Sequence, residues 1–163
     1  MTQDAQYTKR DIMRFTKDKR SANLVILAIV FDCLYFVSLY QTDVGSWYYT
    51  WMIGASIVYN LLFLLIAFLS SESVKSRKSG YSGILIGIGV MQFVRMFYLP
   101  AKAHEAVVVV SGVELKAMED GQYTYVLVCL ALSGLCCIAA AVNSYINNKN
   151  LAEHMRTLDI KPA

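Results

Sequence analysis

The chain has little charge for its length. Only 17% of its 163 residues are Asp, Glu, Lys or Arg, whereas a soluble domain carries about 25%. Hydrophobic residues make up 56% of the sequence, and the mean hydropathy is +0.44. The few charged residues gather between four long apolar runs. This pattern argues against a soluble globular protein and indicates an integral membrane protein.

Residues that supply catalytic or metal-binding chemistry are also scarce. The two histidines, His104 and His154, have no companion at ligand spacing, so the sequence predicts no metal site and no cofactor. The cysteines form no C-x-x-C motif and lie in apolar runs, which disfavours thiolates and favours small buried hydrophobes. They are Cys33, Cys129, Cys136 and Cys137. Without a nucleophile and base constellation, we do not expect an enzyme.

The small excess of basic residues does not predict a nucleic-acid partner. The net charge is +3 and the pI is about 8.6. The basic residues flank the apolar runs, where a membrane surface explains them sufficiently. No basic stripe is interleaved with stacking aromatic residues. We therefore expect a lipid bilayer as the main partner and no nucleic acid.

Four apolar runs are long enough to cross a bilayer as helices. We predict spans at about 23–40, 50–69, 82–100 and 123–143. Runs of about 20 residues, at a rise of ~1.5 Å each, match a hydrocarbon core of ~30 Å. The runs are continuously apolar, and four strands could not close a barrel. The chain 1–163 is thus predicted to be one all-α membrane domain, an up-down bundle with short connections between the first three spans and a longer one before the fourth.

The distribution of lysine and arginine predicts how the bundle is oriented. Segments 1–22, 70–79 and 144–163 hold 12 of these residues, against 2 in segments 41–49 and 101–122 together. Positive residues are retained on the cytoplasmic side during insertion. We therefore expect both termini to be cytoplasmic in a plasma membrane, with the longer connection outside the cell.

Four polar residues fall near the middle of the predicted spans. Asp32 and Gln92 lie ~15 Å from the cytoplasmic edge and Arg95 lies ~20 Å from it. Asn60 lies at a similar level. A charge at this depth costs ~2.5–3.5 kcal/mol on insertion scales, so it should face the bundle and find a partner. We predict that Asp32 and Arg95 pair, with Asn60 and Gln92 completing the network.

Small residues in two spans predict close packing of helices. Gly83 and Gly87 have the GxxxG spacing, and Ser133 and Ala140 share a small face of the last span. Such faces let backbones approach and gain dispersion contacts. The pattern does not decide whether the neighbouring helix belongs to this chain or to another one.

The connection 101–122 is long for a helical bundle. Its β-branched run and turn dipeptide predict a two-residue β-hairpin, with a re-entrant or interfacial segment as the alternative. The run and the turn comprise Val107, Val108, Val109, Val110, Ser111 and Gly112. Because a lone hairpin is marginal in water, we expect this segment to bind a partner.

These observations leave three hypotheses about function. The first is a non-catalytic accessory subunit of a larger membrane complex, such as a transporter assembly. The second is a small homo-oligomeric transporter or channel that uses Asp32 and Arg95. Since these two charges largely neutralise each other, a structural clamp is favoured over a relay, and an unpaired Asp32 would reverse that preference. An integral membrane enzyme is the third hypothesis, and no motif supports it.

Overall fold

The computed structural model describes residues 17–41, 50–78, 80–105, 107–110 and 112–157. Within this part of the chain, four helical segments are long and apolar enough to cross a membrane. They are α2 (Lys19–Tyr40), α3 (Thr50–Lys75), α4 (Tyr81–Met96) continued by α5 (Leu99–Glu105), and α6 (Asp120–Thr157). The chain is therefore a multi-pass helical membrane protein by the length and composition of its helices.

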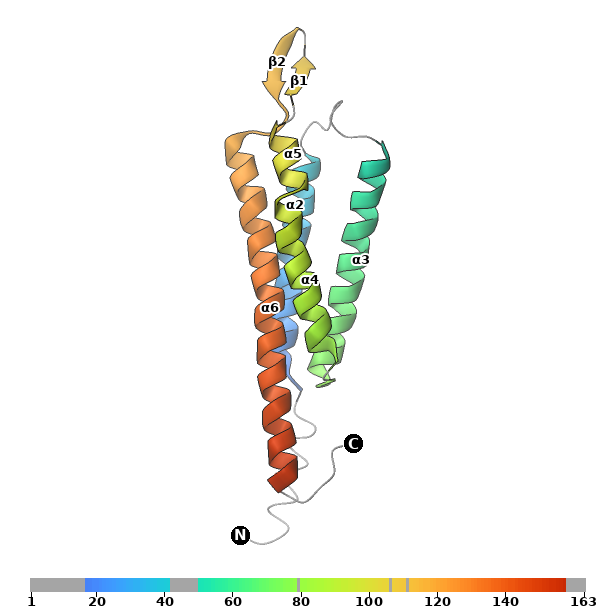
Figure 1. The fold of residues 1–163 in the computed structure, drawn as a ribbon, viewed down its shortest axis with the longest axis vertical. Coiled ribbons are helices and arrows are strands. Elements are labelled where there is room, and N and C mark those ends of the chain that lie inside the picture. The colour runs from blue at the N-terminus through green and yellow to red at the C-terminus, as the bar shows by residue number, and fades with distance from the viewer. Residues whose placement is uncertain (1–16, 42–49, 79, 106, 111, 158–163) are drawn as a thin grey trace.

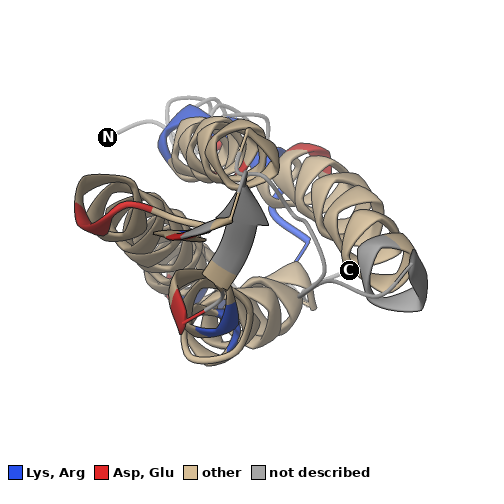
Figure 2. Cartoon of the chain, turned by 90° about the horizontal axis from the view of Figure 1, so that it is seen from above, with Lys and Arg blue, Asp and Glu red and all other residues tan. Residues whose placement is uncertain are grey.

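The helical segments alternate in direction along one bundle (Figure 1). Helix α6 packs extensively on α2 and α4, and α3 packs on α2 and on α4. Seen along the bundle, the four segments form a ring with few charged residues along their length (Figure 2). The start of α2 and the end of α6 lie at one end, opposite the hairpin (Figure 1).

Helices α2, α3 and α6 are longer than the apolar runs that predicted them. Helix α2 begins at Lys19 because Asp18 caps it, with an Asp18 carboxylate oxygen accepting from the Ser21 backbone N–H at 3.2 Å. Helix α6 continues past the predicted end at 143 as a partly exposed extension to Thr157. Hydropathy marks the length that lipid contacts, whereas capping and backbone hydrogen bonds decide where a helix ends.

The third predicted span is two helices. Helix α4 ends at Met96, and α5 begins at Leu99 with Pro100 in its first turn. Proline is tolerated there because the first N–H groups of a helix have no intrahelical acceptor. Pro100 therefore opens α5, and the break falls just before it, at Phe97 and Tyr98. The predicted end of this span at Pro100 is therefore wrong, because the helical segment continues through α5 to Glu105.

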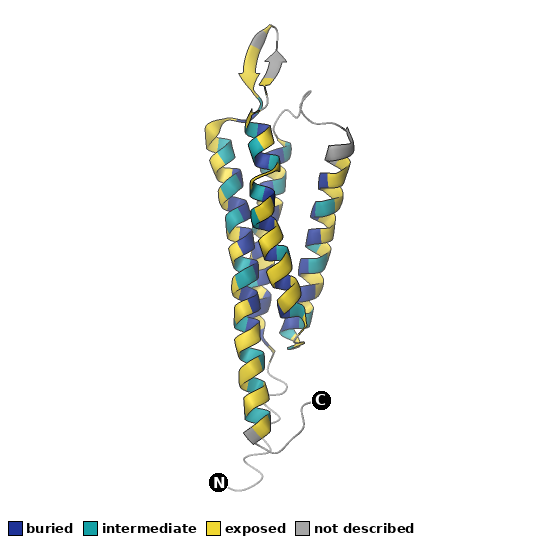
Figure 3. Cartoon of the chain, viewed as in Figure 1, coloured by how far each residue is buried: buried dark blue, intermediate teal, exposed yellow. Residues whose placement is uncertain are grey.

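Burial follows the pattern of a bundle in lipid (Figure 3). The inner faces form two apolar clusters, one around Val25, Leu85 and Cys137 and the other around Tyr35 and Leu130. Large apolar side chains such as Val37 and Leu61 are exposed on the outer faces. In water such a surface would be unfavourable, so the burial pattern is consistent with the membrane assignment.

Glycines bring α4 and α6 together, but not the pair that the sequence singled out. A Cβ atom on Gly134 would lie 2.8 Å from Cε2 of Phe93 and 3.1 Å from the carbonyl oxygen of Gly89. A Cβ on Gly83 or Gly87 would meet nothing within 4 Å among the described residues. The close backbone approach therefore uses Gly89 and Gly134. Packing through Gly83 and Gly87 stays a prediction, for a neighbour outside this chain.

A β-hairpin connects α5 to α6 and stands beyond the helix ends (Figure 1). Strands β1 (Val107–Val110) and β2 (Val113–Lys116) are antiparallel, with Val107 opposite Lys116 and Val110 opposite Val113. Gly112, in the turn, has a φ of 81°, a left-handed conformation that glycine adopts without strain. The base of the hairpin is held to α6, because Asp120 Oδ1 lies 3.1 Å from Lys116 Nζ and 2.9 Å from His104 Nε2.

Several predicted features fall outside the described residues. They are residues 1–16 of the basic N-terminal segment, 158–163 of the tail, Ser111 in the turn and the side chains of Val108, Val109 and Val110.

Candidate functional site

The two charged residues at membrane depth meet inside the bundle. Arg95 on α4 places its Nη1 atom 3.4 Å from Oδ1 of Asp32 on α2. The side chain of Arg95 is 6% exposed and that of Asp32 is 1% exposed. The pair is therefore formed within this chain. Its separation is longer than the ~2.7–2.9 Å of a tight charge-assisted hydrogen bond, so charge attraction acts with little hydrogen bonding.

Gln92 supplies the shorter contact to Asp32. Its Nε2 atom donates to Oδ1 of Asp32 at 2.8 Å and approaches the hydroxyl of Ser133 on α6 at 3.4 Å. The Ser133 hydroxyl donates in turn to the carbonyl oxygen of Ala28 on α2 at 3.0 Å. This network links α2, α4 and α6 at one level. Ser133, predicted only as a small packing residue, is part of it, whereas Ala140 is buried in the apolar core.

Two tyrosines flank the guanidinium of Arg95. Its Cζ atom lies 4.4 Å from the ring centroid of Tyr35 and 4.8 Å from that of Tyr59. Both distances are within the range of cation–π attraction, which strengthens where water is excluded. Neither ring was predicted from the sequence to lie at this site. Tyr35 follows Asp32 by three positions, on the same helix face, and that spacing was a usable signal.

Asn60 does not complete the network as predicted. It is buried on α3, yet within the described part of the chain neither its amide nitrogen nor its amide oxygen has a hydrogen-bond partner. The buried hydroxyl of Ser56, one turn away, also has no hydrogen-bond partner among the described residues. Among the described residues, Nε and Nη2 of Arg95 and Oε1 of Gln92 also lack partners. Buried polar atoms without partners are rare and call for an explanation.

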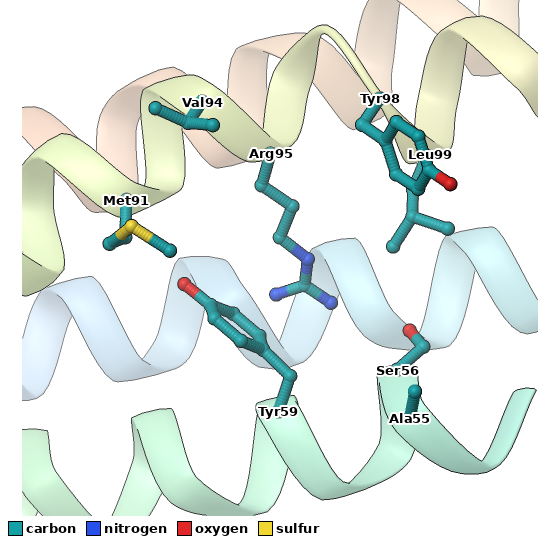
Figure 4. A pocket seen from close by; sticks show the side chains of 8 residues that line it. All are labelled: Ala55, Ser56, Tyr59, Met91, Val94, Arg95, Tyr98 and Leu99. Carbon is teal, nitrogen blue, oxygen red and sulfur yellow. The ribbon is translucent and has the colours of Figure 1, made fainter. Parts of the chain in front are cut away.

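Two of these residues, Ser56 and Arg95, line a cavity between α3 and α4 (Figure 4). Its volume is about 310 Å³, at the lower limit of ordinary ligand sites of about 300–1,000 Å³. Arg95 extends from α4 toward α3, with Tyr59 on one side and Ser56 and Leu99 on the other (Figure 4). The full lining is Ala55, Ser56, Tyr59, Met91, Val94, Arg95, Tyr98 and Leu99.

A second polar cluster lies at the opposite end of the bundle from the hairpin. Oδ2 of Asp18 accepts from the Ser21 hydroxyl at 2.7 Å and from Nδ2 of Asn147 at 2.9 Å. Nδ2 of Asn143 donates to the same Ser21 hydroxyl at 2.7 Å. The cluster therefore holds the start of α2 against α6. Sequence reasoning missed it because these residues fall at or beyond the predicted span ends.

The ionisation of Asp18 reflects these contacts. Burial raises the pKa of its carboxyl, but hydrogen bonds from Asn147 and Ser21 lower it. The positive charge of Arg77 lowers it further. The pKa consequently lies below its ordinary value of 3.8, because the partners stabilise the charged form more than burial disfavours it.

The described residues offer few other groups for metal binding or thiol chemistry. Among the described residues, no group of three His, Cys, Asp or Glu side chains is arranged to hold a metal ion. The four cysteines are free thiols, with Cys129 and Cys137 buried between helices. The chain matches no protein-family model, no curated protein and no solved structure. The assignment of function therefore depends on the geometry alone.

Proposed function

We propose that the chain is a non-catalytic accessory subunit of a larger membrane complex, such as a transporter assembly. The hairpin is the observation that carries this proposal. Its two strands pair with each other and project beyond the bundle (Figure 1). A two-stranded sheet is marginal alone, and its outer edges present unpaired backbone groups that a partner strand binds readily.

The buried charges support a structural role for the bundle. Asp32 is held by both Arg95 and Gln92, so its charge is compensated within the chain. A proton carrier needs a carboxylate that is free to titrate during its cycle. The contacts would instead fix α2 and α4 relative to each other across the bundle, and setting register is the best-attested use of a buried ionic group.

The outer surface offers a second contact for partner subunits. Gly83 and Gly87 are exposed on α4, one turn apart, with open space where a side chain would be. A helix of another subunit would approach this face closely without displacing any part of the bundle. Homo-oligomers would use the same face.

We also propose the orientation of the protein in a plasma membrane. The start of α2 and the end of α6 would face the cytoplasm, because the flanking segments carry most of the lysines and arginines. The hairpin would then lie outside the cell. A partner of the hairpin would therefore be an extracytoplasmic segment of another subunit.

Site-specific crosslinking tests the proposal. A photoreactive amino acid at Glu114, exposed on β2, should crosslink to one membrane protein in stoichiometric amounts in native membranes. The same substitution at Glu153, exposed at the far end of α6, is the matched control and should not crosslink to that protein. Native sizing after mild extraction should give a particle that contains the crosslinked protein as well as this chain.

A matched pair of glycine variants tests the hairpin itself. Gly112→Val should disturb the turn, since φ at this position is 81°, and should reduce recovery of the partner. Gly121→Ala lies in helical backbone with open space around it and should leave recovery unchanged. A lone homo-oligomer that crosslinks from Glu114 only to its own copies would overturn the proposal. It would favour the alternative of a small transporter.

A further inference from the structure

We infer that the cavity between α3 and α4 binds a single-chain fatty acid from the bilayer, with Arg95 as the ligand of its carboxylate. The inference is independent of the proposed subunit role, because it concerns a site that is complete within this chain. Its elements are two donor atoms of a buried guanidinium and a buried hydroxyl, none of which has a partner among the described residues, together with an apolar lining.

The donors of Arg95 define the head group. One nitrogen, Nη1, faces Asp32. Nε and Nη2 have no hydrogen-bond partner in the described part of the chain. These two atoms form one edge of the planar guanidinium, and their parallel N–H groups match the two oxygens of a carboxylate. A carboxylate bound there would satisfy both buried donors at once.

Ser56 adds a third polar group to the same site. Its hydroxyl is buried, lines the cavity from α3 and lacks a partner among the described residues. Figure 4 shows Ser56 facing the side of Arg95 that is opposite to Tyr59. A hydroxyl donates to a carboxylate oxygen as readily as a backbone N–H does. The two helices would thus hold one head group between them.

The rest of the lining suits an acyl chain. Met91, Val94 and Leu99 supply apolar surface along α4 and the start of α5. Arg95 lies midway between Met91 and Leu99, so ~6 Å of apolar lining lies on each side of the head group, and the rest of the acyl chain would extend into the bilayer. Met91 and Val94 are also exposed on the outer surface of the bundle. A ligand could therefore enter sideways from the bilayer.

The charges favour a monoanionic head over a phosphate. Asp32 lies behind Arg95 and carries part of its counter-charge. Gln92 also donates to the Asp32 carboxylate, so Asp32 does not depend on Arg95 alone, and the far edge of the guanidinium can take one further single charge. A phosphate ester, with up to two charges, would add repulsion from Asp32 in a region of low dielectric. A neutral alcohol would leave the two-donor edge of Arg95 only partly satisfied.

Binding to the full chain in phosphatidylcholine nanodiscs tests the inference. Radiolabelled palmitate should bind saturably, and hexadecanol should compete at least about tenfold more weakly because it lacks the charge-assisted contacts. Arg95→Lys retains the charge beside Asp32 but loses the two-donor edge, and it should weaken palmitate binding by about tenfold or more. Lysophosphatidate should compete more weakly than palmitate.

A second variant separates ligand binding from folding. Ala55→Trp fills the cavity from α3 without replacing any residue of the polar network and should abolish saturable palmitate binding. Leu61→Trp, on the exposed surface of the same helix but outside the cavity, should bind within about twofold of the unaltered chain. Undiminished binding by Ala55→Trp would overturn the site. Equal competition by hexadecanol would overturn the role of Arg95, and stronger competition by lysophosphatidate would overturn the choice of a carboxylate.

Discussion

Asp32 accepts a hydrogen bond from Gln92 at 2.8 Å and faces the guanidinium of Arg95 at 3.4 Å through the same oxygen, Oδ1. The carboxylate is therefore held by a neutral amide and a charge together, from one helix. Gln92 and Arg95 are three positions apart on α4, which places both on the inner face that points across the bundle toward α2. This shared contact explains why the two side chains act as one unit in fixing the helix pair.

Removing one charge of this unit should destabilise the bundle more than removing both. Arg95→Met leaves the Asp32 carboxylate buried without its counter-charge, which should cost about 3–5 kcal/mol. The double variant Asp32→Leu, Arg95→Met replaces the pair by apolar contacts and should lose clearly less than the sum of the single losses. Unfolding of each variant in mixed detergent micelles would measure the free energies.

The surface pair Glu72 and Lys75 gives the matched control for this cycle. Their contact is 3.0 Å, but the side chains are 59% and 33% exposed. Replacing either residue should change stability by about 1 kcal/mol or less, because solvent screens the pair. If the double Asp32 and Arg95 variant loses as much as the two single variants combined, the two charges do not stabilise each other.

The glycines of α4 and α6 should differ sharply in their tolerance of a methyl group. Gly134→Ala places a Cβ 2.8 Å from Phe93 and 3.1 Å from a backbone oxygen, so we expect a loss of about 1–3 kcal/mol from overpacking. Gly83→Ala meets no atom within 4 Å and should keep or raise stability, by up to about 1 kcal/mol, through better helix propensity. Thermal unfolding in detergent compares them, and an equal loss for both would contradict the close approach of Gly134 to α4.

How much of this architecture the sequence predicts depends on the physical signal involved. The four helices were predictable, because crossing a bilayer demands long apolar runs whatever their neighbours are. The level of Asp32, Gln92 and Arg95 followed from counting residues along a helix of fixed rise. The hairpin strands followed from the valine run and the turn at Gly112. Each of these depends on local chemistry.

The details that escaped prediction depend on how the helices rotate against each other. Gly83 and Gly87 have the spacing of a packing motif, yet Gly89 and Gly134 make the close approach, because Gly89 faces the inside of the bundle while Gly83 and Gly87 face outward. Asn60 lies at the right depth but on a helix that does not bring it to the network. The depth of a residue in the membrane can be counted from the sequence, but the rotation of each helix about its axis is set by packing against the other helices.

The cap at Asp18 should make stability depend on pH in the acid range. Its folded-state pKa lies below the ordinary value of 3.8, so the carboxylate stabilises the fold above that value. The contribution is lost as pH falls through the folded-state pKa, because the protonated acid loses the favoured charged contacts. Asp18→Ala should cost about 0.5–2 kcal/mol at pH 7. The difference from the unaltered chain should shrink as pH is lowered below 4.

Ser21→Ala serves as the control for this prediction. It removes the hydroxyl that donates to Asp18 at 2.7 Å while leaving the carboxylate and its contact to Asn147 in place. We expect its loss of stability at pH 7 to be smaller than that of Asp18→Ala. Midpoints of thermal unfolding across pH 3 to 7 provide the comparison. A difference between Asp18→Ala and the unaltered chain that is constant with pH would exclude the carboxylate as its origin.

The orientation predicted from the basic residues can be tested by cysteine labelling. Glu114→Cys, on the hairpin, should react with a membrane-impermeant maleimide in intact cells, because the hairpin is expected outside. Glu153→Cys, at the other end of the bundle, should react only after the membrane is opened. The natural cysteines should add only a small background of labelling, since all four lie within the apolar helices. The reverse labelling would mean that the hairpin faces the cytoplasm, and any partner of the hairpin would then have to be sought there.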